Sequence, residues 1–327
     1  MTLAVEPLDR AAFDAADLVR DFPPQWLGRN KRAVWELSSQ GGPFAGAIEY
    51  ARWPARAWPP EVPPGQTPVV KAGVFDYPAD AGPDTAAWHL NFADPLLFGF
   101  YAGDLMAQDE LQVAEHPALG SLREALSARG GTAHTTDGRG PTPITVTGVQ
   151  RRCEIRTQAD PAAGRPASLY GNAFSRAPLQ QVLAATRRLE PPTLSNILAL
   201  AAPDGGFGPY TAKDIRGVLA TAYSGFAAAA QEGAKLPGRP ARTVVHTGFW
   251  GCGAFGGNRT LMTILQALAA DLAGAALVFH AVDSQGAQVA GQGCETYRQL
   301  RAKESGVDRL IRILEARQYE WGEPDGN

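Results

Sequence analysis

Cysteine is scarce in this 327-residue sequence, which holds only Cys153, Cys252 and Cys294, without any CxxC spacing. An odd and widely spaced set argues against a disulfide framework and against a structural zinc site, and it favours a reducing compartment. Metal-ligand spacing is also lacking among the five histidines, and we interpret His246 and His280 as core residues of buried strands. We therefore expect no metal and no cofactor.

Long hydrophobic runs and an excess of positive charge are absent as well. No segment approaches ~18 uninterrupted apolar residues, so we expect no transmembrane helix. Residues 1–22 carry acids throughout and no apolar core, which is unlike a signal peptide. Thirty Lys and Arg face 33 Asp and Glu, a net charge of −3, so the chain lacks the electrostatic footprint of a nucleic-acid binder. We expect a cytoplasmic protein without membrane or nucleic-acid partners.

Glycine and proline, in contrast, are abundant, with 36 and 26 residues spread along the chain. Their spread indicates many loops rather than one disordered tail. The start of the chain differs from the rest: residues 7–22 have helical spacing, and the proline-dense stretch 53–65 is too rich in proline for a helix. We predict an accessory N-terminal extension over 1–65, with an extended connector at 53–65, and a main domain over 66–327.

From residue 69 onward, short apolar runs alternate with helical patterns. Most of the runs are apolar at successive positions, which is typical of strands buried on both faces. Alternation of strand and helix predicts an α/β layered fold with a mostly parallel sheet. The predicted strands are 69–75, 87–93, 144–149, 167–171, 195–203, 242–248 and 276–282; the predicted helices are 104–128, 178–188, 211–233, 258–273 and 304–318.

The stretch 247–258, TGFWGCGAFGGN, joins a predicted strand to a predicted helix. Open α/β sheets bind ligands where strands end, and the N-terminus of a helix favours an anion such as phosphate. The loop fits neither common phosphate motif: no lysine follows its glycines, and the match of 251–256 to GxGxxG lacks the later acidic residue. Trp250 and Phe255 either wall a groove for a diphosphate or fill the core beneath the turn.

A second informative segment, 91–119, carries four carboxylates: Asp94, Asp104, Asp109 and Glu110. A helix starting at Asp104 would make that residue an N-cap. Clustered carboxylates raise one another's pKa, and a partly buried one can act as an acid near neutral pH, as cleavage of a glycosidic bond requires. Each acid taken alone is equally well a cap or a solvated helix residue, so the spacing assigns no role.

Taken together, the two segments resemble the poly(ADP-ribose) glycohydrolases, a branch of the macrodomain fold. The family pattern TGxWGCGAFxGD is followed by an apolar helix and by a strand that ends in aspartate. Here 247–248, 250–255 and 257 match it, Asn258 replaces the aspartate, and Asp283 ends the strand. The family's FAN, triple-glycine loop and QEE correspond without a gap to FAD (92–94), FGF (98–100) and QDE (108–110).

This resemblance implies a fold, a ligand and a set of site residues. The fold is a macrodomain-like three-layer α/β/α sandwich with a mixed, mostly parallel sheet and an N-terminal extension. The ligand is ADP-ribose, with Phe98 and Phe100 in the loop that meets its distal ribose. Glu110 takes the place of the catalytic glutamate, and Asp109 that of the acid before it. The diphosphate would lie on Gly248, Phe249, Trp250, Gly251, Cys252, Gly253, Ala254 and Phe255, with Cys252 as a space-filling residue rather than a nucleophile.

Departures from the family pattern refine the expected reaction. The triple glycine is reduced to Gly99, an aspartate stands at Asp94, an extra acid appears at Asp104, and RRCEIRT (151–157) replaces the tyrosine-containing segment over the adenine. A related branch removes single ADP-ribose units from arginine and uses aspartates in this loop.

We therefore predict a hydrolase that cleaves the C1″ bond of mono-ADP-ribosylated protein at arginine. Its candidate catalytic residues are Asp94, Asp104, Asp109 and Glu110. The alternatives are a poly(ADP-ribose) glycohydrolase, a catalytically silent ADP-ribose-binding macrodomain, and a hydrolase in which the clustered acids bind Mg²⁺.

Overall fold

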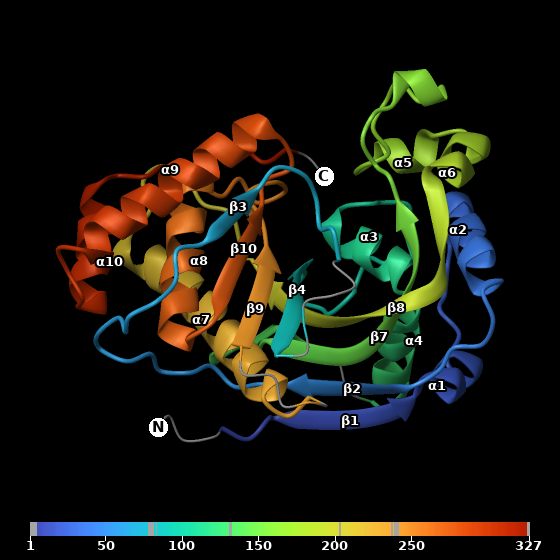
Figure 1. The fold of residues 1–327 in the computed structure, drawn as a ribbon, viewed down its shortest axis with the longest axis horizontal. Coiled ribbons are helices and arrows are strands. Elements are labelled where there is room, and N and C mark those ends of the chain that lie inside the picture. Colours follow the sequence, from blue (N-terminus) through green and yellow to red (C-terminus); the bar gives the residue numbers. More distant parts are fainter. Residues whose placement is uncertain are drawn as a thin grey trace.

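A mixed eight-stranded sheet forms the centre of the computed structural model, which describes residues 5–77, 82, 84–130, 133–202, 204–236, 238 and 242–325 (Figure 1). The strand order is β1-β2-β7-β8-β4-β9-β10-β3, and β5 (Thr136–Asp137) and β6 (Gly140–Pro141) form a separate pair. The sheet strands are β1 (Asp9–Asp14), β2 (Ala47–Arg52), β3 (Val69–Lys71), β4 (Thr85–Ala93), β7 (Ile144–Ile155), β8 (Thr186–Ala201), β9 (Arg242–Thr247) and β10 (Ala276–His280).

The sheet has a parallel half and an antiparallel half. Strands β8, β4, β9, β10 and β3 are parallel to their neighbours, whereas β1, β2, β7 and β8 pair in antiparallel fashion. Figure 1 shows the two halves running in clearly different directions, as the cumulative twist of a large sheet requires. The carboxyl ends of β4, β9 and β10 therefore meet at one edge, where the two loops singled out in the sequence emerge.

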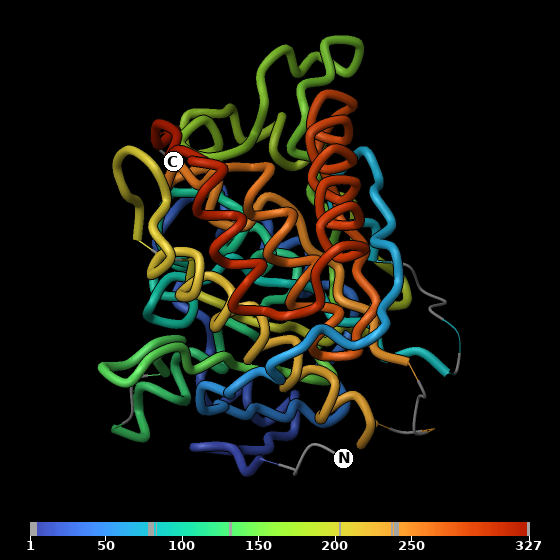
Figure 2. The backbone as a smooth tube through the Cα atoms, turned by 90° about the vertical axis from the view of Figure 1, so that its left-hand side faces the viewer, coloured from blue at the N-terminus to red at the C-terminus, as the bar shows by residue number. Residues whose placement is uncertain are grey.

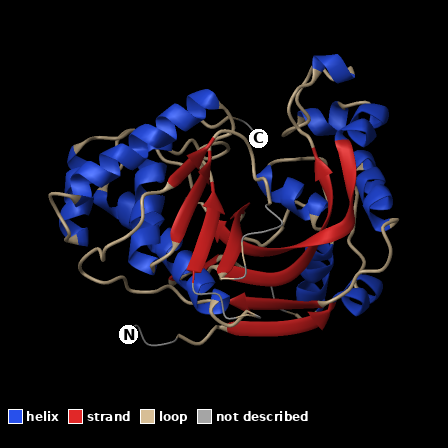
Figure 3. Ribbon diagram, in the orientation of Figure 1, coloured by secondary structure: helices blue, strands red, loops and turns tan. Residues whose placement is uncertain are grey.

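Helices cover both faces of this sheet, which gives the predicted three layers (Figure 3). Strand β8 shows why: Leu198 and Leu200 pack into one core with α7 and α8, while Ile197 and Ala199 pack into a second core with α1 and α4. Alternate side chains of a strand point to opposite faces, so both faces must be apolar and covered. The helices are α1 (Ala15–Asp21), α2 (Arg29–Ser39), α3 (Gln108–Glu115), α4 (Ala118–Ala128), α5 (Ala173–Arg176), α6 (Leu179–Ala185), α7 (Ala212–Gly233), α8 (Arg259–Ala273), α9 (Ser284–Arg301) and α10 (Val307–Ala316).

Most of the predicted elements from residue 69 onward are confirmed, with three corrections. The predicted helix 104–128 is divided into α3 and α4, because the chain turns at His116 and Pro117. The predicted strand 167–171 is wrong, since this stretch is loop held by isolated contacts. Helix α6 ends at Ala185, where β8 begins, so the predicted helix 178–188 runs too far. The sequence reasoning also missed β1, β2, α2 and α9.

The described residues of the N-terminal segment, 5–65, contribute two strands to the sheet. Strand β1 pairs with β2, and β2 pairs with β7 of the main domain. Residues 53–65 form the expected extended connector, which contacts the turn between α9 and α10 through Val62 N to Ser305 O at 2.8 Å and Val307 N to Pro60 O at 2.9 Å (Figure 2). A domain boundary at residue 65 stays a prediction. None of the helices in the described part of the chain is long and apolar enough to cross a bilayer.

Candidate active site

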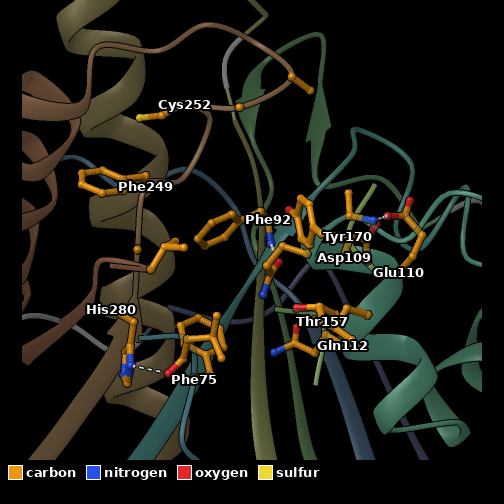
Figure 4. Close-up of a pocket in the computed structure, with 18 of the residues that line it drawn as sticks. Phe75, Phe92, Asp109, Glu110, Gln112, Thr157, Tyr170, Phe249, Cys252 and His280 are labelled. Carbon is orange, nitrogen blue, oxygen red and sulfur yellow. Dashed lines mark hydrogen bonds between the residues drawn. The ribbon is translucent and has the colours of Figure 1, made fainter. Parts of the chain in front are cut away.

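A cavity of about 720 Å³ opens at the carboxyl ends of β4, β9 and β10. The glycine-rich loop after β9 lines one side, and the start of α3 with the loop before it lines the other. In Figure 4, Phe249 and Cys252 lie on the first side, and Asp109, Glu110 and Tyr170 on the second. The volume is in the range of sites that bind a nucleotide-sized ligand. The two segments singled out in the sequence thus face each other.

The shape of the glycine-rich loop depends on residues without a side chain. Gly251 has φ +73°, and a Cβ there would lie 2.8 Å from the Cβ of Ala202. At Gly248, a Cβ would lie 2.7 Å from the carbonyl oxygen of His280. Helix α8 begins directly after the loop, and Asn258 caps it by accepting a hydrogen bond of 3.0 Å from Leu261 N. The glycine-rich loop and Arg259, the first residue of α8, therefore both line the cavity, at the end of the helix whose dipole favours an anion.

The aromatic residues of the loop divide between core and cavity. Trp250 is fully buried, and its Nε1 donates a hydrogen bond of 3.1 Å to the carbonyl oxygen of Leu200, so it supports the loop from beneath. Phe249 and Phe255 line the cavity instead. The guanidinium of Arg259 lies 4.9 Å from the centre of the Phe249 ring. Of the two roles left open by the sequence, Trp250 has the core role and Phe255 the cavity role.

Cys252 lines the cavity as a neutral thiol. Its Sγ lies 3.6 Å from the carbonyl oxygen of Trp250, and burial raises the pKa of Cys252 to about 12. A nucleophilic cysteine needs a lowered pKa, because the thiolate is the reactive form. The environment of this residue therefore favours the space-filling role expected from the resemblance.

The first turn of α3 is fixed to the end of β4 by one side chain. Gln108 accepts a hydrogen bond of 2.7 Å from Phe92 N and donates one of 3.0 Å to the carbonyl oxygen of Leu90. These two hydrogen bonds join the first residue of α3 to the backbone of β4. The two acids that follow it, Asp109 and Glu110, are held in place at the cavity wall as a result.

Asp109 and Glu110 form a buried carboxyl pair. Oδ1 of Asp109 accepts a hydrogen bond of 2.9 Å from Nδ2 of Asn91, and Oε2 of Glu110 accepts one of 3.0 Å from Ala107 N. Burial, and then the neighbouring Glu110, raise the pKa of Asp109 to about 8. Burial also raises the pKa of Glu110. Each of the two acids therefore keeps its proton to a higher pH than an exposed carboxyl group does.

A buried lysine beneath the pair escaped the sequence reasoning. Lys31 on α2 is 1% exposed, and its Nζ donates a hydrogen bond of 2.8 Å to the carbonyl oxygen of Tyr101. Burial lowers the pKa of Lys31 to about 8, opposed by the attraction of Glu110 and Asp109. Its local sequence, RNKRAVW (29–35), has the appearance of a solvated basic turn, so no local signal marks it.

The other predicted acids and phenylalanines do not all reach the cavity. Asp94 lines it and accepts a hydrogen bond of 3.2 Å from Leu96 N. Asp104 is exposed, is not the N-cap of α3, and packs so closely against Gly28 that a Cβ there would lie 2.6 Å from its Oδ1. Phe98 is fully buried at φ +51°, whereas Phe100 is 59% exposed and lines the cavity.

Several cavity residues were not found from the sequence. Tyr170, in the stretch wrongly predicted as a strand, lies beside Asp109 and Glu110 in Figure 4. Deeper in the wall, Nε of Arg151 contacts Oε2 of Glu115 at 2.8 Å, in a buried ion pair. Arg151 comes from β7 and Tyr170 from the loop after it, far in sequence from both motifs, whereas Glu115 is the last residue of α3. Only the tertiary fold brings them to the site.

Comparisons with known proteins agree with the family indicated by the two motifs. Residues 181–289, about a third of the chain, match the model described as poly(ADP-ribose) glycohydrolase (PARG), macro domain fold. This segment begins within α6 and contains all of β8, then α7, β9, the glycine-rich loop, α8 and β10. The predicted macrodomain-type α/β fold is confirmed. No curated protein matches the chain.

Solved structures give more distant likenesses. Poly(ADP-ribose) glycohydrolase from Thermomonospora curvata, bound to the inhibitor ADP-HPD, aligns with 19% identity and a TM-score of 0.42 over 69% of this chain and 79% of that one. The enzyme from Deinococcus radiodurans in complex with ADP-ribose aligns with 14% identity and a TM-score of 0.38 over 90% and 95%. At these identities and TM-scores no residue role carries over to this chain.

Proposed function

We propose that this protein is an ADP-ribose glycohydrolase that cleaves the C1″ glycosidic bond of ADP-ribose units in poly(ADP-ribose). The observation that carries the proposal is the buried pair of Asp109 and Glu110, held across a cavity from an anion-binding glycine-rich loop. Glycoside hydrolysis requires a carboxyl group that is protonated near neutral pH beside a second carboxylate. The family match of residues 181–289 supports the same reaction and substrate.

In this proposal, one wall of the cavity binds the diphosphate and the other carries out the proton transfers. The backbone of the glycine-rich loop binds the diphosphate, and Phe249 and Phe255 shield it from water. One carboxyl group of the pair gives its proton to the oxygen that leaves C1″. A water molecule adds to C1″, and its proton passes to a carboxylate, so the charge is balanced. By resemblance, Glu110 is the general acid, with Asp109 held in register by Asn91.

Hydrolysis of arginine-linked ADP-ribose is the weaker candidate. That hypothesis placed Asp94, Asp104 and Glu110 around the distal ribose and gave the chemistry either to Glu110 or to a pair of Asp94 and Asp104. Asp94 lines the cavity, but the exposed Asp104 packs against Gly28 and does not line it. The assignment to Asp94 and Asp104 is therefore not supported, whereas Asp109 and Glu110 both line the cavity.

The decisive experiment compares two substrates and one variant. We expect the purified chain to release ADP-ribose from poly(ADP-ribose), and Glu110→Gln to lower that rate by about 10²–10⁴-fold. Calorimetry should show that Glu110→Gln still binds ADP-ribose. Release from ADP-ribosyl-arginine protein alone would favour the arginine reaction. Tight ADP-ribose binding without release from either substrate would identify a binding module and overturn the proposal.

A further inference from the structure

Two histidines and an aspartate meet beside the cavity, away from the carboxyl pair, and one of them, His280, lines it. Asp76, His246 and His280 each offer one ligand atom, and these atoms all lie within 4.8 Å of one another. Nδ1 of His246 lies 3.0 Å from Nε2 of His280, which lies 4.0 Å from Oδ1 of Asp76. Two nitrogens and one oxygen at these distances are close enough to bind the same metal ion.

Strand register brings these residues together. In the parallel pair of β9 and β10, His246 lies opposite Val278, and His280 is two residues further along the same face. Strand β3 pairs with β10 so that Lys71 lies opposite His280, and the chain after β3 then carries Asp76 back to the cluster. The three residues are far apart in sequence, which explains why a search for ligand spacing along the chain finds none.

Hydrogen bonding sets the orientation of His280. Its Nδ1 lies 3.0 Å from the carbonyl oxygen of Val74, an interaction drawn as a dashed line in Figure 4. A carbonyl oxygen only accepts, so Nδ1 carries the proton and Nε2 accepts the hydrogen bond from Nδ1 of His246; a metal ion would replace the proton of that hydrogen bond. Metal-ligating histidines use the same arrangement, in which the far nitrogen donates to a backbone carbonyl and fixes the ring.

One carboxylate oxygen of Asp76 faces the two histidines. Lys71 contacts Oδ2 of Asp76 at 2.7 Å, which leaves Oδ1 directed to the histidines. The Asp76 side chain is 45% exposed, so an ion can enter from solvent. His89 stacks on His246 with ring centres 4.5 Å apart, and within the described residues neither of its ring nitrogens has a hydrogen-bond partner. His89 is thus buried against the cluster, and no protein group in the described part of the chain satisfies its ring nitrogens.

We propose that Asp76, His246 and His280 bind one divalent transition-metal ion of the zinc class. Two imidazoles and a carboxylate suit Zn²⁺, whereas Mg²⁺ and Ca²⁺ prefer ligand sets made of oxygen. Val74 and Phe75 line the cavity between β3 and Asp76, so a bound ion fastens this part of the wall to β9 and β10. The site is separate from the carboxyl pair, and the inference does not depend on the proposed function.

The test measures metal binding by the full chain after treatment with a chelator and dialysis. Titration calorimetry with ZnCl₂ should give one ion per chain, and the melting temperature should rise, since only the folded state presents the three ligands. Co²⁺ should give the visible absorption of a site with nitrogen and oxygen ligands. We expect His246→Gln and His280→Asn each to weaken Zn²⁺ binding by at least about tenfold.

Two further variants keep the result decisive. Asp76→Asn changes an exposed side chain, so it should stay folded and still weaken Zn²⁺ binding by about tenfold. His134→Asn changes a histidine outside the cluster and should leave affinity and stoichiometry unchanged. Failure of the parent chain to take up one Zn²⁺ would overturn the proposal. So would equal affinity in the parent and in the folded Asp76→Asn chain, or loss of binding in His134→Asn.

Discussion

The side-chain amide of Asn91 donates a hydrogen bond of 2.9 Å to Oδ1 of Asp109, at the junction of β4 and α3. Donation to a carboxylate favours its charged form, whereas burial and the adjacent Glu110 favour the neutral form. Burial is the largest effect, and the pKa of Asp109 is raised to about 8. The hydrogen bond therefore orients the group without removing its proton. Substitutions can test both the raised pKa of Asp109 and the role of the glycine-rich loop across the cavity.

Asp109→Asn should stabilise the protein, most strongly at alkaline pH. The unfolded pKa of aspartate is about 3.9, so between about pH 4 and pH 8 the folded state holds a proton that the unfolded state has lost. Stability of the parent chain therefore falls as pH rises through this window, and the full cost is present above pH 8. Asparagine carries no such cost, and we expect a gain of at least about 1 kcal/mol at pH 8.5.

Denaturant unfolding of both chains at pH 5 and pH 8.5 measures this effect. The gain should be small at pH 5 and large at pH 8.5. Asp104→Asn is the matched control, because it removes an exposed carboxylate from the same segment and should change stability by less than about 0.5 kcal/mol at either pH. A gain for Asp109→Asn that is equal at the two pH values would show that Asp109 is ionised in the folded state.

Lys31→Met should shift the alkaline limb of the pH–rate profile to higher pH. Burial raises the pKa of Glu110, and the attraction of Lys31 partly offsets that rise. Removal of the ammonium takes this offset away, so the general acid keeps its proton to a higher pH. The measurement is kcat for release of ADP-ribose across pH 6–9.5. Arg32→Met, an exposed neighbour on the same helix, should leave the limb in place.

Lower kcat at every pH, without movement of the limb, would show that Lys31 acts only through packing.

Lys31 also illustrates why part of the site cannot be predicted from the sequence. Its burial results from the packing of α2, which belongs to the N-terminal segment, against the loop 98–106, where the carbonyl oxygen of Tyr101 accepts its hydrogen bond. A contact between segments 70 residues apart leaves no local pattern.

Local patterns predicted the parallel core well and its surroundings less well. Strands such as β9 are apolar at successive positions, and α8 has regular leucine spacing and a cap at Asn258, so both were found. Strand β1, DRAAFD, mixes charge with small residues and was taken for part of a helix. Helix α3 begins at Gln108 rather than Asp104, because Gln108 bonds to the backbone at Phe92 and Leu90 across the strand end. The bounds of such elements depend on strand register, on packing and on hydrogen bonds between distant segments, none of which can be read from the spacing of residues along the sequence.

Asp94→Asn should move the same alkaline limb in the direction opposite to Lys31→Met. Burial is the main cause of the raised pKa of Asp109 and Glu110, and the charge of Asp94 raises both further. Its loss lets the pair ionise at lower pH, while polymer cleavage at pH 6 should stay within about threefold of the parent. Abolished activity in Asp94→Asn at every pH would instead make Asp94 a direct participant, as the arginine-specific reaction demands.

Gly251→Ala should damage ligand binding as well as stability. Its φ of +73° is unfavourable for alanine, and the new Cβ would lie 2.8 Å from that of Ala202, so the loop must shift. A displaced loop no longer aims its N–H groups at the diphosphate, and we expect ADP-ribose affinity to fall by at least about tenfold, since one lost charge-assisted hydrogen bond is worth about 1.5–3 kcal/mol. Calorimetry with ADP-ribose measures the loss.

Gly274→Ala separates the two effects of that substitution. Gly274 has φ +67° at the C-terminal end of α8, and a Cβ there would meet no other part of the described chain within 4 Å. Alanine there carries the same backbone strain, about 1–2 kcal/mol of stability, but lies at the opposite end of α8 from the cavity. ADP-ribose affinity should therefore match that of the parent. Equal loss of affinity in both variants would mean that strain, rather than the shape of the glycine-rich loop, controls binding.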